Sequence, residues 1–161
     1  MRGTVLQINR SKGGIPKTPV EKALVSHRGV DGDDWAHPKF HGGPKQALLL
    51  ITTESLAELK LLGYDLFPGA LGENLTITGM DRREWRAGQR FRAGEVLLEL
   101  TKLRQPCATL NPYGQGIQGH LYDALCKQGD PSSPVWARGG FYASIVQTGT
   151  IHPGDKIELE D

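Results

Sequence analysis

The sequence predicts a mainly β protein, a β-barrel with a few short helices. The 21 glycines and 10 prolines are spread along the whole chain, so many turns separate short elements. Several segments alternate apolar and polar residues with the two-residue period of a strand, and only two segments have helical spacing. Eight or so short strands favour a closed or nearly closed sheet, because closure removes exposed strand edges.

The strand candidates differ in the strength of their alternation. Apolar residues alternate most clearly at 96–100, 141–146 and 155–160, where one face of each predicted strand is apolar. The weaker candidates are 4–8, 20–26, 46–51 and 89–92.

Two segments are predicted to be helical. Segment 53–62 has a threonine cap, Glu54 in its first turn, leucines at helical spacing, and Gly63 just beyond its end. Segment 118–127 places leucines on one face and ends at Gly129.

Length and charge limit the classes of function. The 161 residues are the size of one domain, so we expect a single domain over 1–161. The formal charge of +1 provides no global field for a nucleic acid polymer or a membrane surface. The polar N-terminus and the lack of an apolar run of about 18 residues predict a cytoplasmic protein with no membrane span. Its two cysteines are therefore expected to be free thiols.

The stretch Arg104-Gln105-Pro106-Cys107 carries the strongest chemical signal. It follows the predicted strand at 96–100, so Cys107 is expected where a strand ends and a loop begins. A nearby cation favours the thiolate, which is the reactive and metal-binding form of cysteine. The alternative for Cys107 is a small buried hydrophobe. For Cys126, which lies beside the apolar stripe of a predicted helix, burial is the favoured interpretation.

Segment 31–47 combines histidines, aspartates, lysines and glycines ahead of a predicted strand. Its plain interpretation is a solvated, turn-rich connection. Alternatively, the turn at His41, Gly42 and Gly43 presents backbone N–H groups to an anion, with His41 and Lys45 as further donors.

Two other chemistries remain open for the same histidines. A zinc site formed by His37, His41 and Cys107 matches the ligand types, but Pro38 interrupts a regular helical pair and no local cysteine pair supports it. A Cys–His hydrolase would need Cys107 close to His41 or His37.

Two polar positions elsewhere are weaker candidates. Glu73 and Asn74 lie at a glycine turn ahead of a short strand, which taken alone is typical of a hairpin. Asn111 follows Cys107 by four residues and is placed either to orient a polar ligand near the thiol or to form a turn.

Taken together, the chain resembles the MOSC domain family, named for the C-terminal domain of molybdenum cofactor sulfurase. The resemblance covers roughly residues 1–160 and is closest to the stand-alone bacterial YiiM group. It rests on four motifs in order: Gly32-Asp33, His41-Gly42-Gly43 with Lys45-Gln46-Ala47, Gly72-Glu73-Asn74-Leu75, and Arg104-Gln105-Pro106-Cys107. The chain departs from the larger YiiM-type proteins in being shorter after the cysteine.

The resemblance implies a MOSC-type β-barrel that binds molybdenum cofactor (molybdopterin). Cys107 occupies the position of the family's metal-ligating cysteine, and is the catalytic residue that the resemblance implies. The residues implied as cofactor contacts are His41, Gly42, Gly43, Lys45, Glu73, Asn74, Arg104 and Asn111.

The activity implied is reduction of small N-hydroxylated substrates, such as N-hydroxylated bases and amidoximes, with electrons from a separate reductase. The alternative is a non-catalytic module that carries molybdenum cofactor, or sulfur as a persulfide on Cys107, in exchange with a delivery protein.

Overall fold

The computed structural model describes residues 1–34 and 43–161. Within them, seven strands close into a barrel in the order β11-β7-β8-β9-β5-β6-β1, with β1 pairing back to β11. The barrel strands are β1 (Arg2–Arg10), β5 (Leu48–Thr52), β6 (Leu75–Thr78), β7 (Arg90–Ala93), β8 (Val96–Leu103), β9 (Phe141–Gln147) and β11 (Lys156–Glu160). Closure was expected from the many short strands and is confirmed.

The described part of the chain forms four further strands outside this ring. Strand β2 (Thr18–Val20) pairs with β1 at the edge of the barrel. Strands β3 (Ala23–Ser26), β4 (Gly29–Val30) and β10 (Gly149–Ile151) form a separate small sheet in the order β10-β3-β4.

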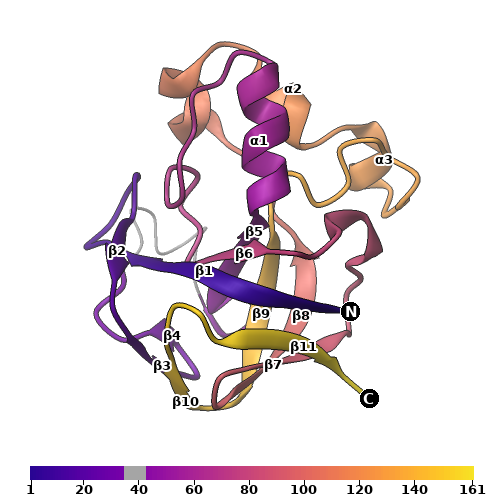
Figure 1. The fold of residues 1–161 in the computed structure, drawn as a ribbon. Coiled ribbons are helices and arrows are strands. Elements are labelled where there is room, and N and C mark those ends of the chain that lie inside the picture. The colour runs from indigo at the N-terminus through magenta and orange to yellow at the C-terminus, as the bar shows by residue number, and fades with distance from the viewer. Residues whose placement is uncertain (35–42) are drawn as a thin grey trace.

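The helices gather at one end of the barrel, as Figure 1 shows. They are α1 (Thr53–Leu61), α2 (Ile117–Leu121) and α3 (Ala124–Lys127). The described residues also form the 3₁₀ helices η1 (Pro44–Gln46), η2 (Arg82–Glu84) and η3 (Ala108–Tyr113). No helix in the described ranges is long and apolar enough to cross a membrane.

Strand β5 lies between two hydrophobic clusters, which explains why all five of its residues are buried. Leu48 and Leu50 point into the barrel and pack with Phe91, Leu98 and other barrel residues. Ile51 points the other way and packs beneath α1 and α2. Successive side chains of a strand point to opposite faces, so a strand that reads as a continuous apolar run can serve two cores.

Helix α1 is the connection between β5 and β6, which pair in parallel. Thr52 caps the helix, since its side chain accepts a hydrogen bond from the Ser55 N–H at 3.2 Å. A hairpin joins antiparallel strands, whereas parallel strands need a crossover connection. The glycine turn at 69–79 therefore does not lead into the hairpin that the sequence suggested. Instead β6 inserts between β5 and β1.

The predicted helix at 118–127 is divided into α2 and α3. Tyr122 and Asp123 are extended, and the Asp123 side chain caps α3 by accepting from the Cys126 N–H at 2.9 Å. An aspartate competes with the backbone for hydrogen bonds, so it begins a new helix here instead of continuing the first.

Candidate functional site

Cys107 lies where β8 gives way to a loop, as the sequence predicted. The last backbone bond of this run joins the Arg104 N–H to the carbonyl oxygen of Gly140 at 2.9 Å. Gly140 has a φ of 106°, and a Cβ there would lie 2.9 Å from the Leu50 carbonyl oxygen, so glycine alone fits. Cys107 then occupies the cap position of η3 with extended backbone.

The Cys107 thiol is partly exposed and lines a cavity of about 800 Å³. Its Sγ lies 2.9 Å from the Thr109 Oγ1. The cavity is bounded by η1, by the loop before β7, by β8 and β9, and by the chain from α2 to Trp136. A volume of this size is within the range of small-molecule and cofactor sites.

The cavity is cationic. Its described lining includes Arg86, Lys102 and Lys127, which come from three different parts of the fold, and it includes no aspartate or glutamate. These three cations were not identified from the sequence, because they belong to no shared local motif and meet only when the barrel closes.

Four aromatic side chains form the apolar part of the lining: Tyr122, Trp136, Phe141 and Tyr142. Trp136 and Phe141 are in an edge-to-face arrangement with ring centroids 6.3 Å apart. Burial raises the pKa of the Tyr142 hydroxyl, an effect that a Cys107 thiolate reinforces and the Arg104 charge opposes. The Tyr142 hydroxyl therefore stays protonated at neutral pH and is able to donate.

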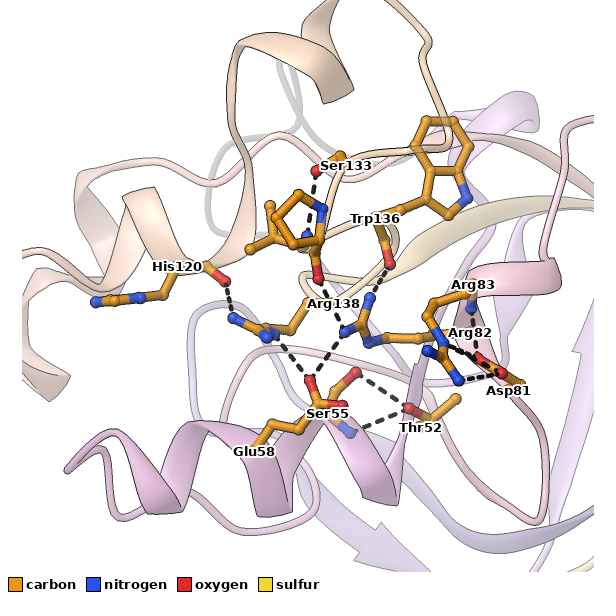
Figure 2. Close-up of polar contacts among 12 residues, drawn as sticks. Thr52, Ser55, Glu58, Asp81, Arg82, Arg83, His120, Ser133, Trp136 and Arg138 are labelled. Atoms are coloured by element: carbon orange, nitrogen blue, oxygen red, sulfur yellow. Dashed lines mark hydrogen bonds and ion pairs between the residues drawn. The ribbon is translucent and has the colours of Figure 1, made fainter.

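A network of hydrogen bonds and ion pairs around Glu58 holds the chain that carries Trp136, as Figure 2 shows. The Glu58 Oε2 of α1 accepts from Arg82 and from Arg138, both at 2.9 Å. Arg82, which is buried, also donates to the backbone carbonyl oxygens of Trp136 and Pro134. The network thus fixes the chain at 134–138, which carries one wall of the cavity.

Cys126 also lines the cavity, but in a different environment from Cys107. It is 4% exposed, in agreement with the expected burial, and both cysteines are free. Its Sγ donates to the Ser133 Oγ at 3.3 Å, and Ser133 donates to Asp123 at 2.9 Å. Burial is the largest influence on Cys126 and raises its pKa, so the thiol form is favoured.

Arg104 is not among the residues that line the cavity. Its side chain is 7% exposed, and it donates to the carbonyl oxygens of Gly139 at 3.2 Å and Leu71 at 2.9 Å. The guanidinium therefore joins the end of β8 to two other loops. The expectation that Arg104 contacts the cofactor stays a prediction.

Glu73 and Asn74 belong to a buried polar network on the β1 side of the barrel. The Asn74 Nδ2 donates to the Asn9 carbonyl oxygen at 3.2 Å and to the Asp33 Oδ2 at 2.9 Å, and Asp33 forms an ion pair with Lys17. Glu73 is fully buried and accepts from the Thr76 hydroxyl at 3.0 Å. Burial raises the pKa of Glu73, against the opposing effect of nearby backbone N–H groups. Neither residue lines the cavity.

The remaining predicted contacts are dispersed. Asn111 is exposed and its Oδ1 accepts from Gln118 at 3.0 Å, away from the cavity lining. Lys45 is exposed on η1, next to Gln46, which does line the cavity. Gly43 precedes η1 with a φ of 90°, which requires a glycine. His37, His41 and Gly42 lie outside the described residues.

A metal site made only of protein ligands is not found in the described ranges. No group of three or more His, Cys, Asp or Glu side chains that could hold a metal ion occurs there. Within residues 1–34 and 43–161, Cys107 is the soft donor that lines the cavity with partial exposure. Its chemistry suits a metal that brings most of its own ligands.

Comparison with known proteins agrees with this geometry. Residues 37–158 match the MOSC domain. The chain is 30% identical to protein YflK of Bacillus subtilis over 151 residues, which cover 91% of this chain and 62% of YflK. It is 33% identical to protein YiiM of Escherichia coli over 102 residues, which cover 60% of this chain and 46% of YiiM. The chain thus spans less than two thirds of the length of either relative.

The fold is similar to a solved YiiM. The crystal structure of YiiM from Geobacillus stearothermophilus has a TM-score of 0.72 and 26% identity, covering 99% of this chain and 75% of that protein. The chain forms a closed barrel, and the cysteine of its Arg-Gln-Pro-Cys motif lines a cavity. The MOSC domain matches most of the same sequence. The chain belongs to the MOSC domain family.

Proposed function

We propose that this protein binds molybdenum cofactor through Cys107 and reduces N-hydroxylated bases or amidoximes with electrons from an external donor. The observation that carries the proposal is the partly exposed Cys107 thiol, which lines a cationic cavity of about 800 Å³ without a described carboxylate. The MOSC match and the likeness to YiiM support the same assignment.

The residues present fit this cofactor. A thiolate is a suitable ligand for a soft metal centre, whereas the carboxylates that favour hard cations do not occur in the described lining. The Gln46 Oε1 is buried without a hydrogen-bond partner in the described part of the chain, so a polar group of a bound ligand would satisfy it.

Segment 41–45 would hold the phosphate of the cofactor. Gly43 and Lys45 precede Gln46, which lines the cavity, by three residues and one residue, and His41 and Gly42 lie outside the described residues. Backbone N–H groups at glycines together with a lysine are suitable partners for a phosphate. Cys107 would ligate the metal.

When bound, the cofactor supplies the two-electron chemistry that removes oxygen from an N-hydroxyl group. The overall change, R–NHOH + 2e⁻ + 2H⁺ → R–NH₂ + H₂O, needs protons in a site walled by aromatic rings. Tyr142 is positioned to hold such a proton, since it lines the cavity and burial keeps its hydroxyl protonated. Thr109 would orient the Cys107 sulfur through its 2.9 Å contact.

The experiment is a metal analysis followed by turnover. Purified protein is expected to contain molybdenum and to reduce an N-hydroxylated base when an artificial electron donor is added. Protein that lacks molybdenum even after incubation with the cofactor would refute the proposal.

A second function uses the same thiol. Cys107 is partly exposed, as a carrier of cofactor or persulfide sulfur would require. Molybdenum or a 32 Da adduct on Cys107 without reduction of any N-hydroxylated compound would favour this carrier over the enzyme.

A further inference from the structure

Three cations of the cavity are left unassigned when Cys107 and segment 41–45 hold the cofactor. Arg86 precedes β7, Lys102 is on β8, and Lys127 is in the last turn of α3. None of them forms an ion pair with a described carboxylate, and no described carboxylate lines the cavity. Their charges are therefore available to a ligand.

Arg86 is pre-positioned for an anion. Its Nη1 donates to the carbonyl oxygens of Arg83 at 2.6 Å and of Trp85 at 2.8 Å, which fixes the plane of the guanidinium. Its Nε and Nη2 have no hydrogen-bond partner among the described residues, and a guanidinium edge of this kind matches a phosphate with two parallel bonds.

The aromatic groups lie beside these cations. The Arg86 guanidinium is 5.5 Å from the centre of the Trp136 ring, and the Lys102 Nζ is 6.0 Å from the centre of the Tyr142 ring. Trp136 is buried, so the partly exposed Tyr142 is the ring against which a flat ligand could pack, and Lys102 would then be near an anionic group attached to that ligand.

We propose that Arg86, Lys102 and Lys127 bind a phosphate of the substrate, so that this cavity selects N-hydroxylated nucleotides over the corresponding neutral bases and nucleosides. The inference rests on the proposed function, because it names the substrate class of the same cavity. The phosphate of the cofactor is the other source of such an anion, and the experiment separates the two.

The test measures binding of AMP and of adenosine to the purified chain by calorimetry, with molybdenum content determined on the same preparations. AMP is expected to bind at least tenfold more tightly than adenosine, and this preference is expected to shrink with added salt because exposed charges are screened. Arg86→Gln and Lys102→Ala are each expected to reduce the preference by about three- to tenfold, since each removes one charged partner of the phosphate.

The controls are Arg28→Gln and Lys60→Ala, which remove exposed cations that do not line the cavity and are expected to leave the preference unchanged. Equal binding of AMP and adenosine by wild type overturns the inference. It is also overturned if Arg86→Gln and Lys102→Ala lower the molybdenum content but leave the AMP preference intact, because the cations then serve the cofactor. A clear AMP preference in protein that binds no molybdenum supports the phosphate site and refutes the proposed function instead.

Discussion

The guanidinium of Arg104 donates to the carbonyl oxygen of Leu71 at 2.9 Å, and so joins the Cys107 loop to the loop that leads into Glu73. One buried side chain thereby connects the Arg104-Gln105-Pro106-Cys107 motif to the residue just before Gly72-Glu73-Asn74-Leu75. The guanidinium of Arg104, three residues before Cys107, thus donates to backbone carbonyl groups.

Arg104→Ala is expected to lower the free energy of unfolding by about 2–4 kcal/mol, because it leaves two buried carbonyl groups without a charged donor. Arg104→Lys is expected to recover part of this loss, since lysine keeps the charge but lacks the planar fork. Urea unfolding measures both, with the exposed Arg28→Ala as control. A wild-type midpoint for Arg104→Ala would contradict the structural role.

Glu73 predicts a specific pH dependence of stability. Burial raises its pKa above the ordinary 4.5, so the folded protein holds this proton more tightly than the unfolded chain. The stability that it contributes is full below about pH 4.5 and is lost as the pH rises through the raised native value.

Glu73→Gln is expected to remove this dependence, so that the variant gains stability relative to wild type as the pH rises. The measurement is urea unfolding of both proteins at a series of pH values from 4 to 8. A constant difference between them over that range would show that the carboxyl titrates normally.

The ion pair between Lys17 and Asp33 is a third target. It is buried, with an Nζ–Oδ1 distance of 2.6 Å, and the same carboxylate accepts from Asn74. Lys17→Met is expected to destabilise the protein by about 3–5 kcal/mol, because it leaves a buried charge without its partner.

The double variant Lys17→Met/Asp33→Leu is expected to recover part of that loss, since no uncompensated charge remains. Recovery should be incomplete because Asn74 loses its acceptor. Thermal unfolding of the single and double variants at one pH forms the cycle, and additive losses would argue against a coupled pair.

Glu58 is predicted to act on the cavity from a distance. Glu58→Gln weakens the bonds to Arg82 and Arg138 that fix the chain at 134–138, so we expect a loss of about 1–2 kcal/mol in stability. Amide hydrogen exchange at 134–138 should also become faster. The exposed Glu21→Gln is the matched control, and unchanged exchange in Glu58→Gln would show that Trp136 is held by other contacts.

Much of the barrel was predictable from local patterns. The alternation at 96–100 and 141–146 identified β8 and β9, and the leucine spacing at 53–62 identified α1. The features of the barrel that local patterns did not predict depend on pairing between distant segments. The parallel position of β6 beside β5 follows from an α1 crossover, which a glycine turn at 69–79 does not reveal.

The sequence predicted the cysteine of the candidate site but not the cationic side chains that line the cavity. Cys107 was identified because it lies just past a predicted strand and three residues after Arg104 in the sequence. Arg86, Lys102 and Lys127 approach one cavity only through barrel closure and the α3 turn. The direction of Arg104 depends on carbonyl groups at Leu71 and Gly139, which are distant in the chain.

The assignment of the metal ligand is tested most directly by the molybdenum content of two cysteine variants. Cys107→Ser is expected to abolish molybdenum binding, because a hydroxyl is a harder and far less acidic ligand than a thiol. Cys126→Ser is expected to retain the metal and to change stability only, since the Cys126 thiol is buried and bonded to Ser133. Retention of molybdenum by Cys107→Ser, with loss in Cys126→Ser, would contradict the central claim.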